Sequence, residues 1–248
     1  MTELSKLLGL LCAEAVLGLL FWFVYRNLSR LYPRPHLVHW THAWALLLAH
    51  LVVALGDGVV ANVFGPVSVA RALTATLYTA TSNLGLSALA VGMYEFVENR
   101  ALDPRTIRVV GGIGIALAAV VGLAPLSGVL PVEWAHTFPE APRAMCAVVA
   151  ACGALAATLR QGPRQGWDRG MLLSRAGLLG LIGAQGYAAV LSLAPDAPAW
   201  TPAQTVLDVL VWSTLGVGVV TWILEREHGR LQEVTQAHRA REIGRAHV

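Results

Sequence analysis

The sequence has few charged residues and almost no lysine. Asp, Glu, Lys and Arg make up 13% of its 248 residues, and Lys6 is the single lysine beside 17 arginines. Soluble domains average about 25% charged residues, so a chain with water on all sides is excluded. The formal net charge of +3 arises from arginines at the ends of apolar segments. Such a distribution argues against nucleic-acid binding, which needs a continuous basic face.

Cysteine and catalytic motifs are also scarce. The three cysteines, Cys12, Cys146 and Cys152, stand within apolar segments and lack the spacing of a disulfide framework or a zinc site. The chain contains no H-E-x-x-H, no G-x-S-x-G and no paired-aspartate motif. We therefore assign no catalytic residue, metal ligand or cofactor, and leave open whether a parent protein is an enzyme.

What the chain does have is a series of long apolar stretches. Hydrophobic residues make up 56% of it, and seven stretches of about 20 residues can cross a hydrocarbon core of ~30 Å. They begin near Leu4, His39, Val67, Ile107, Arg143, Met171 and Ala203. The sequence predicts an all-α polytopic membrane protein with seven transmembrane helices.

Basic residues gather in alternate connections. Fourteen lie in the first, third and fifth connections and in the tail: Arg26, Arg30, Arg34, Arg100, Arg105, Arg108, Arg160, Arg164, Arg169, Arg175, Arg226, Arg230, Arg239 and Arg241. The other side has Lys6, Arg71 and Arg143. By the positive-inside rule the N-terminus lies outside and the C-terminus in the cytoplasm, with the lipid bilayer as the main partner.

Aromatic and small residues suggest how the helices meet lipid and one another. Five tryptophans fall at or near cytoplasmic helix ends and predict an interfacial belt: Trp22, Trp40, Trp44, Trp167 and Trp222. Small residues predict close helix packing in the fourth and sixth spans: Ala118, Gly122, Gly177, Gly180, Gly183 and Gly186.

Polar residues at membrane depth are candidates for function, because they are costly there. We expect a polar cavity, open to the outside, lined by the candidate ligand-binding residues Asp57, Arg71, Tyr78, Gln185 and Asp208. Glu14 and His50 are expected at its floor as candidates for a protonation switch, since burial favours a neutral form. The alternative is that these groups satisfy one another and simply hold the helices together.

The tail continues the pattern of the last span. Apolar residues and two polar ones follow a 3–4 spacing: Val217, Val220, Leu224, Glu227, Leu231, Val234 and His238. A short parallel coiled coil has this pattern, and it would make the protein a homodimer. A solvated, charged helix end is the alternative.

The sequence therefore divides into a transmembrane domain (1–224), a cytoplasmic signalling helix (225–241) and a last segment (242–248). The six residues from Ile243 to Val248 are those that ATCGGAAGAGCACACGTC encodes, a string that matches a widely used sequencing adapter. We expect this last segment to be non-native read-through, with an output domain missing from the sequence.

Two local patterns are similar to known sensor modules. The stretch Tyr25–Arg30, followed by Pro35–Trp40 and Trp44, resembles their first cytoplasmic loop, and Gly216–Glu227 resembles their exit into an acidic-basic linker. The chain thus resembles the N-terminal seven-transmembrane sensor region of bacterial histidine kinases and diguanylate cyclases. The resemblance implies a sensory input module in the bacterial cytoplasmic (inner) membrane, which relays a stimulus from an unknown ligand through its seventh helix.

Two other classes of function stay open. One is a small-molecule or ion transporter or channel, although the halves show no obvious repeat and no span is broken at its midplane. The other is an intramembrane metal or haem protein, for which His39, His42 and His50 have the right chemistry. Bis-histidine haem binding would need a facing histidine at similar depth on another span, and the sequence places none there.

Overall fold

The structure, a computed structural model, describes residues 3–65, 67–128, 140–160, 168–192 and 202–246. Of these residues 93% are helical, and none is in a strand. The helices are α1 (Glu3–Leu31), α2 (Pro35–Phe64), α3 (Val69–Glu98), α4 (Pro104–Leu123), the short 3₁₀ helix η1 (Ala124–Ser127), α5 (Glu140–Arg160), α6 (Arg169–Leu191) and α7 (Pro202–Ala246). The prediction of an all-α chain with seven long helices is confirmed, and each begins within four residues of its expected start.

Local sequence explains where several helices begin and end. Pro35 and Pro104 lie in the first turns of α2 and α4, where proline loses no helical hydrogen bond. The side chains of Ser68 and Asp103 accept hydrogen bonds from the first turns of α3 and α4. Asn99 ends α3 in the left-handed conformation, with φ of 51°.

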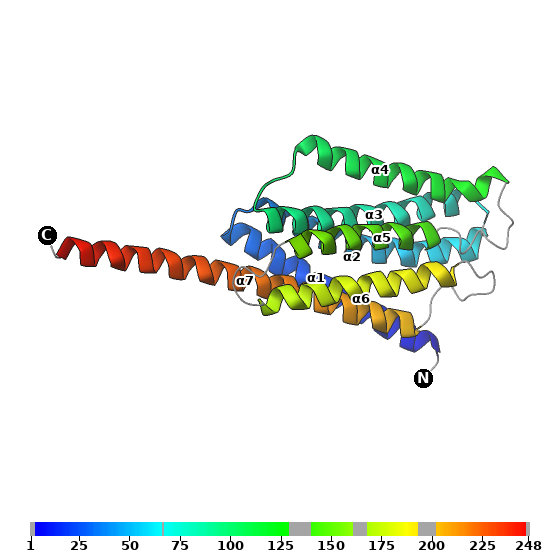
Figure 1. The fold of residues 1–248 in the computed structure, drawn as a ribbon. Helices are drawn as coiled ribbons and strands as arrows, with labels where there is room; N and C mark the ends of the chain where they lie inside the picture. Colours follow the sequence, from blue (N-terminus) through cyan, green and yellow to red (C-terminus); the bar gives the residue numbers. More distant parts are fainter. Residues whose placement is uncertain (1–2, 66, 129–139, 161–167, 193–201, 247–248) are drawn as a thin grey trace.

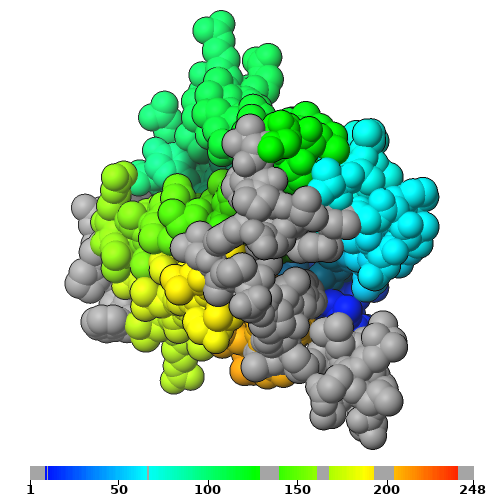
Figure 2. All heavy atoms as spheres, turned by 90° about the vertical axis from the view of Figure 1, so that its right-hand side faces the viewer, coloured from blue at the N-terminus to red at the C-terminus, as the bar shows by residue number. Residues whose placement is uncertain are grey.

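Six of the helices form a closed ring. Each helix contacts the next in the order α1, α2, α3, α5, α6 and α7, and α7 contacts α1 to close the ring. Helix α4 stands outside the ring and packs mainly on α3, as its position at the edge of the ribbon shows (Figure 1). Seen end-on, α4 (green) lies across the molecule from α7 (orange), with the α2–α3 corner (cyan) at one side (Figure 2).

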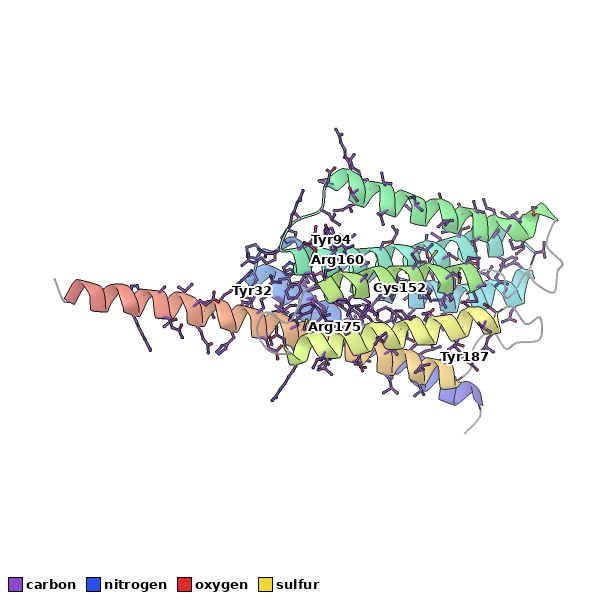
Figure 3. All side chains as sticks on the ribbon, viewed as in Figure 1. Tyr32, Tyr94, Cys152, Arg160, Arg175 and Tyr187 are labelled. Carbon is purple, nitrogen blue, oxygen red and sulfur yellow. The ribbon has the colours of Figure 1, made fainter. Side chains whose placement is uncertain are left out.

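A helix extends beyond the bundle at one end and not at the other. Helix α7 continues far past its neighbours at one end, here called the tail end (Figure 1). The labelled Tyr32, Tyr94, Arg160 and Arg175 lie toward the tail end, and Tyr187 lies toward the opposite end, here called the cavity end (Figure 3). The described residues of the arginine-rich connections therefore lie at the end from which the tail leaves.

Within the part of the chain that the structure describes, five helices, not seven, are long and apolar enough on their own to cross a membrane: α1, α2, α4, α5 and α7. Helix α3 falls outside this set because it carries buried polar residues such as Ser82, Asn83 and Glu95. Helix α6 carries Arg175 and the buried Gln185. Both helices lie in the ring, where much of their surface meets protein.

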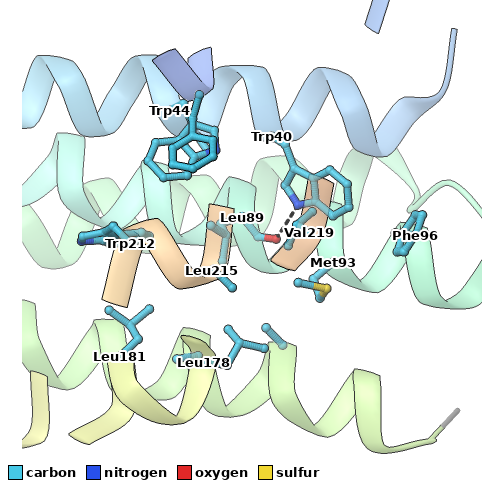
Figure 4. Close-up of a cluster of buried hydrophobic side chains, with 14 of the residues drawn as sticks. Trp40, Trp44, Leu89, Met93, Phe96, Leu178, Leu181, Trp212, Leu215 and Val219 are labelled. Carbon is cyan, nitrogen blue, oxygen red and sulfur yellow. Dashed lines mark hydrogen bonds between the residues drawn. The ribbon is translucent and has the colours of Figure 1, made fainter. Parts of the chain in front are cut away.

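A cluster of large side chains fills the middle and the tail end of the ring (Figure 4). The indole of Trp40 is 1% exposed, and its Nε1 donates a hydrogen bond to the carbonyl oxygen of Leu89 at 3.3 Å. Trp44 stacks on Phe21 with ring centroids 4.7 Å apart, and meets Trp212 edge-on at 5.8 Å. Each aromatic ring thus packs on residues of another helix.

The predicted tryptophan belt is wrong for three of its members. Trp40, Trp44 and Trp222 are between 1% and 4% exposed, so they lie inside the bundle rather than at its outer surface. Trp22 is partly exposed, beside the guanidinium of Arg26, and Trp167 lies outside the described residues. Sequence position near a helix end could not tell an inward-facing indole from an outward-facing one.

The predicted close packing through small residues is confirmed in part. A Cβ at Gly177 would lie 2.7 Å from the Cα of Leu215, so α6 and α7 touch backbone to backbone there. Ala118 is fully buried, and a Cβ at Gly122 would overlap Thr76 of α3. Gly183 and Gly186, by contrast, have nothing within 4 Å of a Cβ and contribute no close contact.

Helix α7 is 45 residues long and extends unbroken into the tail. The predicted helical continuation is therefore confirmed, and Gly229 does not interrupt it. On the tail, Leu224, Leu231 and Val234 are exposed by 51%, 62% and 69%. Pairing of this stripe with a second copy of the chain stays a prediction.

Candidate functional site

A polar cavity lies at the centre of the ring, toward the cavity end. Its volume is about 40 Å³, and all six ring helices line it: Glu14 from α1, Leu47 and Leu51 from α2, Ser82 and Leu86 from α3, Arg143 and Ala147 from α5, Leu181 and Gln185 from α6, and Gln204, Thr205, Asp208 and Trp212 from α7. A cavity of this size holds one or a few water molecules or a small ion, and no metabolite.

Three of the seven candidate residues meet in this cavity: Glu14, Gln185 and Asp208. The Nε2 of Gln185 donates a hydrogen bond to Oδ1 of Asp208 at 3.3 Å, which links α6 to α7. The Oε1 of Gln185 and the Oε2 of Glu14 are buried, and neither accepts a hydrogen bond from a described residue. The cavity therefore presents oxygen acceptors that the surrounding side chains leave unsatisfied.

Arg143 is a cavity residue that sequence reasoning missed, since it was counted merely as a basic residue on the outer side. Its side chain is 10% exposed, and its Nε donates to Oε2 of Glu140 at 2.9 Å. Its guanidinium lies 5.6 Å from the ring centroid of Tyr78. A basic and an acidic residue three apart, at the start of an apolar stretch, were a usable signal in the sequence.

Asp57 and Arg71 do not line the cavity, because they form an ion pair with each other. The Nε of Arg71 lies 3.0 Å from both carboxylate oxygens of Asp57, and the hydroxyl of Thr74 donates to the same carboxylate. Both side chains are largely buried, at 10% and 15% exposed. This geometry matches the alternative in which polar groups satisfy one another between helices.

His50 and Tyr78 form a third contact, between α2 and α3. The two rings stack with centroids 4.3 Å apart, and Nδ1 of His50 lies 3.0 Å from the carbonyl oxygen of Tyr78. His50 therefore does not line the cavity. The polar stripe of α2 does face one helix, since His39, His50 and Asp57 all contact residues of α3.

The residues predicted to line one cavity thus form three separate polar groups, and one of these groups lines a cavity. The Asp57–Arg71 pair and the His50–Tyr78 stack join α2 to α3, and the group of Glu14, Gln185 and Asp208 faces the cavity. Helical spacing placed residues on the correct faces, but it could not show which neighbouring helix each face meets.

At the tail end, two adjacent residues of α7 bind the ends of two other helices. The backbone N–H of Gly170, at the start of α6, donates to Oε2 of Glu225 at 3.0 Å. Nη1 of Arg226 donates to the carbonyl oxygen of Phe96 in the last turn of α3, and its guanidinium lies 4.9 Å from the Phe96 ring. Each charge matches the helix end that it meets. We call these two contacts the α7 clasp.

A second layer of contacts surrounds the clasp. Arg230 donates to Oδ1 of Asn99 at 3.2 Å and binds Glu227 at 2.8 Å. Glu227 also lies 3.8 Å from Arg34, which precedes α2. Sequence reasoning had treated these charges as a linker and an orientation signal, without contacts to the bundle.

Among the described residues, no group of three or more His, Cys, Asp and Glu side chains is arranged to hold a metal ion. His42 is exposed, and His39 lies 3.6 Å from Glu95.

Comparison with family models, curated proteins and solved structures gives no match to the chain.

Proposed function

We propose that this chain is the membrane-embedded input module of a bacterial signal-transduction protein. In this proposal all seven helices cross the cytoplasmic membrane, with the N-terminus outside and the tail in the cytoplasm. Helices α3 and α6 cross within the ring, where their polar residues face protein rather than lipid. The concentration of arginine at the tail end supports this orientation.

The observation that carries the proposal is the continuity of α7. One unbroken helix contains Asp208 in the cavity, Glu225 and Arg226 in the clasp, and the exposed tail. A helix transmits displacement along its axis because its hydrogen bonds hold its length. A change of packing at the cavity would therefore reach the tail through a single element, as a sensor requires.

Signalling requires two states that a stimulus binds unequally. The clasp provides a discrete difference between such states, since its contacts are either made or broken. With Glu225 and Arg226 bound, α7 is fixed to α6 and α3. With both released, α7 loses these two fixed points at the tail end, while its backbone contact with α6 at Gly177 remains.

The proposed partner of the tail is a second copy of the chain. The exposed residues Leu224 and Leu231 are seven apart, and Val234 follows three residues later, which is the spacing that the seam of a parallel coiled coil requires. Pairing along such a seam would couple the movements of the two tails.

Disulfide cross-linking in native membranes tests this arrangement. In a background with Cys12, Cys146 and Cys152 replaced, Leu231→Cys should form a dimer on mild oxidation. Gln236→Cys, on the opposite side of the helix, is the matched control and should stay monomeric. Equal cross-linking of both, or of neither, would contradict a paired tail.

The native gene, read past codon 241, tests the sensory role itself. A frame that continues into a kinase or diguanylate cyclase domain supports an input module and identifies its output. A stop codon close by contradicts it and favours a free-standing transporter or channel.

A further inference from the structure

The central cavity is lined by more acidic than basic side chains. Glu14 of α1 and Asp208 of α7 both line it, and Glu140 is the first residue of α5. Arg143 is the one basic residue that lines the cavity among the described residues, and its Nε is bound by Glu140 at 2.9 Å. Two acidic side chains therefore line the cavity with one guanidinium, whose Nε is already bound by a third carboxylate.

Other titratable groups near the cavity do not alter this balance. Tyr78 of α3 faces Arg143, and His50 of α2 stacks on Tyr78 and binds its carbonyl oxygen. Asp57 and Arg71 neutralise each other elsewhere on the α2–α3 interface. Unbalanced negative charge at membrane depth is costly, so the carboxylates of Glu14 and Asp208 favour an occupant with positive charge.

The hydrogen-bonding groups point to the same kind of occupant. Gln185 is 4% exposed and lines the cavity, and its Oε1 accepts no hydrogen bond from a described residue. The Oε2 of Glu14 is buried and unpartnered in the same way. The Nε2 of Gln185 already donates to Asp208, so the oxygen of this amide is the atom left without a partner. A buried acceptor without a donor is costly, and a cation or a donated proton would satisfy it.

We propose that the cavity formed by Glu14, Gln185 and Asp208 binds one small monovalent cation, either Na⁺ or a proton. Two carboxylates and an amide oxygen are hard oxygen ligands, which suit an alkali cation. A volume of about 40 Å³ excludes organic cations. The role of this ion as the stimulus rests on the sensory function proposed above, whereas its binding does not.

The ligands also give the ion a mechanical role. Gln185 belongs to α6, Asp208 to α7 and Glu14 to α1, which are neighbours in the ring. An ion shared among them draws the cavity end of α7 toward α1 and α6. Loss of the ion leaves two carboxylates to repel each other and separates α1 from α7.

Thermal unfolding of the purified full chain in lipid nanodiscs tests the proposal. NaCl replaces choline chloride at constant ionic strength, at pH 8.5 and at pH 5.5. For Na⁺ we expect a saturable rise in Tm at pH 8.5, with at least tenfold weaker apparent affinity in Glu14→Gln and Asp208→Asn. For a proton we expect no sodium effect and a rise in Tm at pH 5.5 that both variants lose.

Asp57→Asn is the matched control. It removes a carboxylate of the same helical bundle that is bound to Arg71, away from the cavity. The control should keep the full sodium or pH response. The proposal is overturned if wild type shows neither response, or if Asp57→Asn loses it as fully as Asp208→Asn does.

Direct binding of ²²Na⁺ to the wild-type chain keeps the test decisive if the variants do not fold. Saturable binding displaced by unlabelled Na⁺, and not by Cs⁺ or choline, supports the sodium form. Absence of such binding, together with a Tm that is the same at both pH values, would exclude both forms. Neither readout needs an output domain, so the sensory proposal can fail while this one stands.

Discussion

The tail end and the cavity end of the ring are packed by different chemistry. At the tail end, and in the middle, aromatic rings such as Trp40, Phe96 and Trp222 fill the space between helices, each less than 4% exposed. At the cavity end, Glu14, Arg143 and Asp208 surround an open volume. Interlocked rings have few alternative arrangements, whereas charged groups around a small space change with what they bind. In the proposed sensory role, the cavity end would be the part that responds and the tail end the part that transmits.

Truncating an aromatic residue of the tail end should have the largest effect. Trp40 packs on Tyr25 and Phe96 with centroids 5.7 Å and 5.4 Å apart. Trp40→Ala should lower the free energy of unfolding by about 3–5 kcal/mol, because it leaves a large cavity. Ser82→Ala at the cavity end should cost less than about 1 kcal/mol. Denaturation in detergent checks both values, and equal losses would contradict the contrast.

Inserting a methyl group into the backbone contact between α6 and α7 should have the next largest effect. Gly177→Ala places a methyl group 2.7 Å from the Cα of Leu215. We expect a loss of about 1–3 kcal/mol, since neither backbone can move without displacing its helix. Gly183→Ala on the same helix meets nothing within 4 Å and is the control. Similar Tm values for the two variants would show that the helices are not in close contact.

Releasing the clasp should alter motion more than stability. Arg226→Ala removes the hydrogen bond to the carbonyl of Phe96 and the contact with its ring. We expect a cost of about 1 kcal/mol, together with faster amide exchange in the last turn of α3. Arg239→Ala, in the exposed part of the tail, should leave that exchange unchanged. Unchanged exchange in Arg226→Ala would mean that α7 is not held at α3.

Breaking the Asp57–Arg71 pair should have the smallest effect. Interhelical polar contacts in membranes average about 0.6 kcal/mol, because the separated helices find other partners. The coupling energy between Asp57 and Arg71 should therefore be about that amount, and Arg71→Ala should leave membrane insertion intact. A double-mutant cycle with Asp57→Asn isolates the coupling between the two side chains, and a value several times larger would assign the pair a larger share of the stability of the cavity end.

The sequence predicted elements better than partners. Apolar length predicted seven helices because it reflects local composition, and polar spacing placed His39, His50 and Asp57 on one face of α2. Neither signal contains the order of helices around a ring. For this reason the sequence left open whether Arg71 pairs with an aspartate or binds a ligand, and the structure pairs it with Asp57, whereas Arg143 was passed over.

Two further differences have the same origin. From hydropathy we expected every helix to be apolar enough to face lipid. Helices α3 and α6 are less apolar than a membrane span requires, because they carry polar residues such as Asn83 and Gln185, which are buried in the protein. Trp40 and Trp222 were expected in the headgroup layer, and they lie inside the bundle. In each case the deciding factor was which side of a helix faces protein, and composition does not contain it.

The position of the clasp along α7 has a geometric consequence. Glu225 stands 17 residues after Asp208 on one helix, so at 1.5 Å per residue about 25 Å of helix separates the cavity from the clasp. If α7 turns as a rigid rod about the clasp, a sideways displacement at the cavity reverses its direction in the tail.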